Sequence, residues 1–259
     1  EINDDSDVIN LQIDINVILH WCETWHMELN TIKCKVMRVS RNHSVSPCYC
    51  LNNVPFLSVS SYKYLGVHIT SYLSWKIHIG YVIGNANRML GYLKRNFSLG
   101  PSSLKLSLYK TLVRSKLEYA SSIWDPSLLI LVNPLEAVQN RSALFILSNY
   151  QRTASVTSMK SNLSLPGVAS RRKVARLCFF HKVFHTNSFL SQRLLTPPFY
   201  VSSRLDHPHK VGVPLCSTNT FQQSFIPKTS LDWNRLPTSI AIIQADDLFK
   251  TAVSNFYCS

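Results

Sequence analysis

The hydrophobic positions of the first thirty residues repeat with the period of an α-helix. Apolar side chains recur at steps of three and four residues, at Val8, Leu11, Ile15, Ile18 and Cys22. This spacing predicts a helix with one apolar face. The preceding Asp-Ser-Asp at residues 5–7 is typical of a helix N-terminus, where side-chain oxygens accept bonds from unpaired amides and acids favour the dipole.

The period changes to two in the next segment. Residues 34–40 carry Cys34, Val36, Met37 and Val39 and predict one strand, and residues 62–69 alternate and predict a second. In the second strand Leu65, Val67 and Ile69 would share one side. Turn-forming residues fill positions 43–55, where we expect a hairpin.

A helical period returns from Trp75 and predicts a helix up to Phe97 with two distinct stripes. One stripe is apolar and is expected to lie in the core: Val82, Ala86, Leu90, Leu93 and Phe97. The other mixes an amide, cations and an aromatic ring, a combination found on surfaces that contact phosphates and stack bases: Asn85, Arg88, Tyr92 and Arg95.

Gly100-Pro101 ends that helix and Ser102 begins another, which ends at Asp125-Pro126. Its predicted core face is leucine-rich, and Lys110 and Arg114 share a different face. The leucines are Leu104, Leu108 and Leu112. Further helices are expected over about 133–149, 168–187 and 244–256, with an irregular segment over about 190–230 that is rich in Pro, Ser and Thr. The fold class is therefore mainly α with a small antiparallel β element.

The distribution of charge along the chain indicates a class of function. Residues 31–116 hold thirteen Lys and Arg and no acid, and residues 137–205 hold ten and no acid, whereas residues 1–30 hold seven acids and no Lys or Arg. Tracts of one sign cost stability through self-repulsion, so they indicate a polyanionic partner, and a nucleic-acid backbone is the commonest. A solubilising face or an anionic membrane surface is the alternative.

Composition adds further limits. The 259 residues are 46% hydrophobic, enough for one large domain or two small ones. The longest apolar runs, such as Leu128–Val132, are too short to span a bilayer, and we expect no membrane association. Seven scattered cysteines indicate reduced thiols in an intracellular protein that is not secreted. The chain starts at Glu1, which suggests a fragment.

Candidate chemistry is sparse. Asp4-Asp5 is expected to cap the first helix, and Asp246-Asp247 to form the first turn of the last helix, so neither pair predicts a metal site. His43, Cys48 and Cys50 give only a weak zinc pattern. Asp206, His207, His209 and Cys216 cluster, and we interpret the histidines as surface residues of a loop.

Several segments, taken in order, resemble the reverse transcriptases of non-LTR (LINE-type, jockey-like) retrotransposons. Trp21-Cys22-x-x-Trp25-x-Met27-x-Leu29-Asn30-x-x-Lys33-Cys34-Lys35 resembles the stretch that follows the catalytic aspartates. Residues 62–67 resemble the primer grip, and residues 108–126, ending in Ile123-Trp124-Asp125-Pro126, resemble the thumb. Residues 135–141 and Asp232-Trp233-Asn234-x-Leu236-Pro237 resemble the C-terminal extension, so the resemblance covers about residues 8–256.

The resemblance implies a palm end over 1–72 with the primer-grip strand, a helical thumb over 73–128 and a C-terminal extension over 129–259. The catalytic aspartates have no counterpart here. We therefore expect no cofactor bound by this chain, with Mg²⁺ belonging to the intact polymerase, and no polymerase activity of the chain alone. Lys33 matches a lysine that can protonate the leaving pyrophosphate and is an inherited catalytic candidate only.

The expected partners are RNA and DNA as a template–primer duplex, and the missing upstream palm and fingers of the same polyprotein, in the nucleus, the cytoplasm or both. The residues expected to contact nucleic acid are Lys33, Lys35, Lys63, Tyr64, Gly66, Arg88, Tyr92, Arg95, Lys110, Arg114, Arg171, Arg172 and Lys173. Two alternatives stay open: an inactive transposon-derived remnant, and a general basic nucleic-acid-binding or interaction protein.

Overall fold

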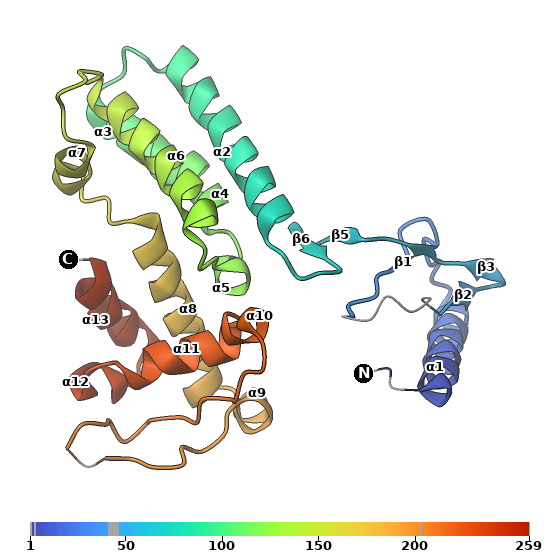
Figure 1. Ribbon diagram of the computed structural model, residues 1–259. Helices are drawn as coiled ribbons and strands as arrows, with labels where there is room; N and C mark the ends of the chain where they lie inside the picture. The colour runs from blue at the N-terminus through green and yellow to red at the C-terminus, as the bar shows by residue number, and fades with distance from the viewer. Residues whose placement is uncertain (1, 3, 41–46, 203, 259) are drawn as a thin grey trace. The chain divides into compact units, whose positions relative to one another are not determined.

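The computed structural model describes residues 2, 4–40, 47–202 and 204–258, which fall into two compact units, residues 1–78 and 79–259. The strands, all in the first unit, are β1 (Lys35–Val36), β2 (Cys50–Leu51), β3 (Val54–Pro55), β4 (Leu57–Ser58), β5 (Ser61–Tyr64) and β6 (Val67–Thr70). The helices (Figure 1) are α1 (Asp5–Thr24), α2 (Lys76–Asn96), α3 (Ser102–Leu108), a π-helical turn (Tyr109–Val113), α4 (Arg114–Glu118), α5 (Ser121–Trp124), α6 (Leu129–Leu147), α7 (Val156–Asn162), α8 (Val168–His185), α9 (Ser188–Leu194), α10 (Asn219–Gln222), α11 (Phe225–Asn234), α12 (Thr238–Ala241) and α13 (Asp246–Cys258).

The mainly helical fold with small antiparallel sheets confirms the predicted class. The two units divide after His78, close to the expected boundary at 72, and residues 79–259 form one unit that includes the position of the expected boundary at 128. Helix α8 is central to this second unit, and α13 and α11 pack against it. Their shared core includes Leu177, Phe180, Trp233 and Phe249.

Helix α1 has the predicted N-terminus and an unexpected distribution of apolar side chains. The Asp4 carboxylate accepts a bond from the Asp7 amide at 2.9 Å, so the acid pair caps the helix as predicted. The side chain of Gln12 bonds both backbone groups of Cys50, at 2.8 and 2.9 Å, and so attaches the helix to β2. The predicted apolar stripe is only partly covered, because Cys22 is buried whereas Leu11 and Ile18 are exposed.

A second apolar stripe of α1 has no cover in the structure. It consists of exposed residues at four-residue spacing, which we call the outer face of α1: Ile9, Ile13, Val17, Trp21 and Trp25. Trp25 is 65% exposed and Val17 62%. Soluble proteins seldom expose so large a continuous apolar surface unless another surface covers it.

The strands differ from the predicted pattern in one important place. Residues 62–69 form a hairpin instead of a single strand, because β5 and β6 pair antiparallel with Tyr64 opposite Val67. Leu65 and Gly66 make the two-residue turn with φ of 45° and 86°, and positive φ at both positions is what a tight hairpin requires. Alternation alone cannot show such a reversal, since it continues through the turn.

The remaining strands are short. The predicted strand 34–40 is reduced to β1, which pairs in parallel with β4, with Lys35 opposite Leu57. The predicted hairpin over 43–55 is confirmed by β2 and β3, which pair antiparallel around Asn52 and Asn53. Residues 41–46, including His43 of the weak zinc pattern, lie outside the described residues.

Residues 102–118 bury a different face from the one predicted. Leu104 and Leu112 are exposed, and the buried side chains are Lys105, Tyr109, Val113 and Leu117. Twelve residues make about 3.3 turns of a regular α-helix, so residues 105 and 117 would not share a face. The π turn at Tyr109–Val113 accommodates one extra residue, which brings these twelve residues close to three whole turns.

The C-terminal half largely follows the predicted elements. Helices α6, α8 and α13 match the three expected helices, although α6 starts earlier, at Leu129, with Pro134 near its beginning. Asp246 and Asp247 lie in the first turn of α13, as predicted. Helix α11 begins inside the segment expected to be irregular and continues past it to Asn234, and Ser224 before it and Pro227 in its first turn are helix-start signals.

Candidate nucleic-acid interface

The exposed face of α2 brings together the predicted cation–aromatic stripe. Val82, Ala86, Leu90 and Leu93 are buried, so the helix presents its other side to solvent. Arg88 and Arg95 are exposed there with Tyr92, which is 50% exposed, between them. Arg88 donates to the amide oxygen of Asn85. No described carboxylate lies within 4.0 Å of either arginine.

Two further cations that the sequence did not single out lie on the flank of α2 toward α6. Arg141 of α6 donates to the amide oxygen of Asn87 at 3.0 Å. Burial, and then the positive charge of Arg141, lowers the pKa of Lys94, whose Nζ lies 5.9 Å from the centre of the Tyr150 ring. Bringing like charges together costs free energy that an anionic ligand would recover. We call Arg88, Tyr92 and Arg95 the α2 surface.

The first unit carries the predicted primer-grip residues on the β5–β6 hairpin. Lys63 and Tyr64 are exposed beside the turn at Gly66. The Tyr62 hydroxyl donates to the Lys33 carbonyl oxygen at 3.0 Å, which places the exposed Lys33 next to β5, while Lys35 is half-buried in β1. This contact joins the Lys33 backbone to Tyr62, whose neighbour Lys63 points to the opposite face of β5.

Lys110 and Arg114 are half-buried instead of forming an open face. Arg114 lies 3.8 Å from the Glu118 carboxylate, and Arg171 also bonds this carboxylate. Burial, and then the charge of Arg171, lowers the pKa of Arg114. The two residues are therefore less available to a ligand than the α2 surface.

The basic run 171–173 is directed into the protein. Arg171 holds Glu118 with two nitrogens, Arg172 is 0% exposed with its Nε bonded to Asp125 at 3.0 Å, and Lys173 pairs with Asp232 at 2.8 Å. We therefore correct the prediction that these three side chains contact a duplex: they bond carboxylates of the second unit instead. The run looked solvent-exposed because its carboxylate partners lie about fifty positions away in sequence.

The two Trp-Asp motifs of the resemblance meet at Arg176 of α8. Its guanidinium bonds Asp125 at 2.8 Å and also bonds Asp232. Lys228 donates to Asp125 at 2.9 Å. Burial alone would raise the pKa of Asp125, but Lys228, Arg176 and Arg172 outweigh burial and lower it. We call Asp125, Arg172, Arg176, Lys228 and Asp232 the buried ion network.

The other matching residues also stabilise this unit from within. Trp124 and Trp233 are fully buried and donate from Nε1 to the carbonyls of Tyr119 and His209, at 2.8 and 2.7 Å. Gln139 accepts from the Tyr109 hydroxyl at 2.8 Å. These residues of the resemblance are therefore buried and stabilise the fold of the second unit. The exposed arginines Arg88 and Arg95 lie outside the matching segments.

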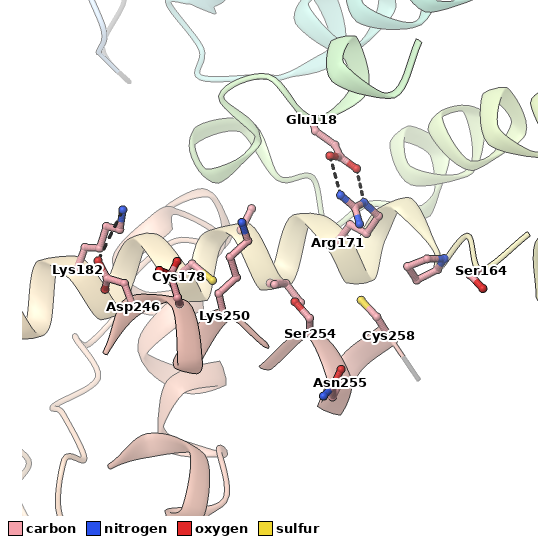
Figure 2. A pocket seen from close by; sticks show the side chains of 14 residues that line it. Glu118, Ser164, Arg171, Cys178, Lys182, Asp246, Lys250, Ser254, Asn255 and Cys258 are labelled. Carbon is pink, nitrogen blue, oxygen red and sulfur yellow. Dashed lines mark hydrogen bonds and ion pairs between the residues drawn. The ribbon is translucent and has the colours of Figure 1, made fainter. Parts of the chain in front are cut away.

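A pocket of about 790 Å³ lies between α8 and α13. Figure 2 shows Glu118 and Arg171 facing each other at one end and Lys182 and Asp246 at the other. Burial raises the pKa of the Cys178 thiol in its wall. A protonated thiol is a poor nucleophile, and nothing in this lining assigns a reaction.

The loop histidines are placed differently from the prediction. His207 is buried with Nε2 donating to the Trp233 carbonyl at 3.0 Å, and His209 bonds the Ala241 carbonyl at 3.1 Å, so both serve packing. Asp206 accepts from Lys210 at 2.7 Å. Among the described residues no group of three His, Cys, Asp or Glu side chains can hold a metal ion, so no described site here suits the Mg²⁺ that the resemblance implies, and no catalytic step is assigned.

Comparison with known protein families, curated proteins and solved structures finds no match to this chain. Within the described ranges, every helix is too short or too polar to cross a bilayer.

Proposed function

We propose that the chain is the palm end, thumb and C-terminal extension of a non-LTR retrotransposon reverse transcriptase, and that the α2 surface holds the backbone of a template–primer duplex. The observation that carries this proposal is the pair of exposed arginines on either side of Tyr92, Arg88 and Arg95, with no ion pair to any described carboxylate. Such a surface contacts phosphates, which fix position without carrying sequence information. The β5–β6 hairpin would hold the primer end in the same way.

The proposal predicts a salt-dependent, sequence-independent affinity. An Arg88→Ala/Arg95→Ala variant should bind an RNA–DNA hybrid about tenfold or more weakly, because it lacks two phosphate contacts. Each lost contact should also reduce the magnitude of the slope of log K against log salt by roughly 0.9. Fluorescence anisotropy at several salt concentrations, with two hybrids of unrelated sequence, measures both quantities.

The matched control is Arg235→Ala/Lys250→Ala, which removes the same charge from two other exposed positions of the same unit. It should retain most of the affinity and the slope. Binding by the α2 double variant at wild-type strength, or wild-type binding that ignores salt, would contradict the proposal.

The outer face of α1 supports the second proposed partner, an upstream palm segment of the same polyprotein. An apolar stripe that no described residue covers is the surface on which another piece of a core would pack. The seven acids of residues 1–30, with no Lys or Arg among them, favour a partner surface that carries cations beside its apolar side chains.

Removing that stripe should make the isolated chain better behaved. An Ile13→Ser/Val17→Ser/Trp21→Gln variant is expected to bind less of an apolar dye and to elute with a larger monomer fraction, at unchanged helix content, because all three side chains are exposed. Leu19→Ser, on the half-buried inner face, is the control and should reduce stability instead. If the triple variant aggregates as much as the wild type, the proposal that the outer face of α1 binds an upstream segment is contradicted.

A further inference from the structure

Residues 196–212 form a loop whose two ends are held together. The Gly212 amide donates to the Thr196 carbonyl at 2.7 Å. A Cβ on Gly212 would lie 2.7 Å from the Pro197 carbonyl oxygen, so this close approach requires glycine. We call the described residues of this segment, 196–202 and 204–212, the closed loop. In Figure 1 it leaves α9 and returns toward α10.

The returning arm of the closed loop is attached to α11. His207 donates to the Trp233 carbonyl at 3.0 Å, and Trp233 donates to the His209 carbonyl at 2.7 Å. The Asn234 side chain bonds both backbone groups of Val211, at 2.9 and 2.8 Å. These contacts bury His207 and Val211, so the loop has a fixed base despite its lack of regular structure.

The outgoing arm presents two adjacent aromatic rings to solvent. Phe199 is fully exposed and Tyr200 is 70% exposed, and Pro197-Pro198 restrict the backbone before them. Exposed arginines, Arg193 and Arg204, lie on either side in sequence. The nearest acid in sequence is neutralised, because Asp206 accepts from Lys210 Nζ and from the Ser202 amide, both at 2.7 Å.

We propose that Phe199 and Tyr200 stack on the bases of single-stranded nucleic acid, with Arg193 and Arg204 neutralising its backbone. Aromatic rings beside cations, on a positive surface, are the usual means of binding single strands, because every base offers a flat face. Bases within a duplex are already stacked on one another and cannot use these rings. The proposal goes beyond duplex binding and shares with it only the premise that the ligand is nucleic acid.

The closed loop and the α2 surface lie at opposite ends of the second unit in Figure 1, so their ligands can be tested separately. The probes are a single-stranded RNA 12-mer that carries 2-aminopurine and the RNA–DNA hybrid of the same sequence. Stacking on the protein should change the 2-aminopurine emission of the single strand. A Phe199→Ala/Tyr200→Ala variant should bind that strand about tenfold or more weakly and bind the hybrid unchanged.

Because both rings are exposed, the double variant should keep its thermal midpoint. Phe221→Ala, another exposed aromatic position of the unit, is the control and should bind the single strand normally. Gly212→Ala leaves both rings in place but forces the ends of the loop apart, and should also weaken single-strand binding. Normal single-strand binding by Gly212→Ala would overturn the role of the fixed base.

The outcomes separate this inference from the proposed function. If the wild type binds the hybrid but not the single strand, or if the ring variant binds the single strand normally, this inference alone is overturned. If the wild type binds neither, both proposals are overturned. Binding to phosphatidylserine vesicles that needs the two rings, without single-strand binding, would overturn the inference in favour of a membrane contact.

Discussion

An Asp125→Ala variant is expected to lose about 3–5 kcal/mol of unfolding free energy, the usual cost of leaving a buried charge without its partner. The loss would leave Arg172 and Lys228 without this carboxylate and Arg176 with Asp232 as its remaining carboxylate partner, because all three cations bond Asp125. Urea unfolding followed by circular dichroism measures the change. Asp247→Ala is the matched control: that acid is exposed in the first turn of α13, where helix-dipole effects are worth at most about 1 kcal/mol.

The buried ion network also predicts a pH dependence. The folded-state pKa of Asp125 is lowered, so its contribution is fully present above the unfolded value of about 3.9. It is lost as the pH falls through the folded value. Equal stability of Asp125→Ala and Asp247→Ala would show that the network does not stabilise the unit.

His78 is expected to make the chain less stable in mild acid. The side chain is 1% exposed, and its Nδ1 accepts from the His68 amide at 3.2 Å. Burial, and then the charges of His68 and Lys63, lower its pKa from 6.5 to about 4. The unfolded state therefore takes up a proton between these two pH values while the folded state does not. Stability should fall by about 3 kcal/mol from pH 7 to pH 4.

NMR titration of the imidazole signals gives the folded pKa of His78 directly. His78→Asn retains an acceptor near Nδ1 but cannot titrate, so the difference in unfolding free energy between wild type and variant should shrink as the pH falls. An imidazole that titrates near 6.5 would contradict the prediction.

Sequence periodicity was sufficient where a segment's own pattern decided its structure. The stripe Val82, Ala86, Leu90 and Leu93 is buried as expected, and the same pattern predicted that Arg88 and Arg95 would be exposed. It failed at residues 102–118, where leucine and tyrosine stripes competed. Helix propensity does not predict the π turn, which places Tyr109 and Val113 in the core.

Charge alone was a poorer guide to the candidate site. Arg171 and Arg88 are equally basic, but one meets Glu118 and the other meets solvent. That difference depends on which distant carboxylate the fold brings near, which composition does not record. For the same reason the sequence did not associate Arg141 with Lys94, since the packing of α2 and α6 alone brings them together.

The π turn at Tyr109–Val113 has a consequence for insertions and deletions. Removing one residue there would leave eleven steps between Lys105 and Leu117, which is about three turns of a regular α-helix, so both side chains would stay on one face. A regular helix over the full length would instead turn Leu117 out of the core and Glu118 away from Arg171. The π turn therefore lets this segment lose one residue without a change of face, whereas a second deletion would rotate everything after it by about 100°.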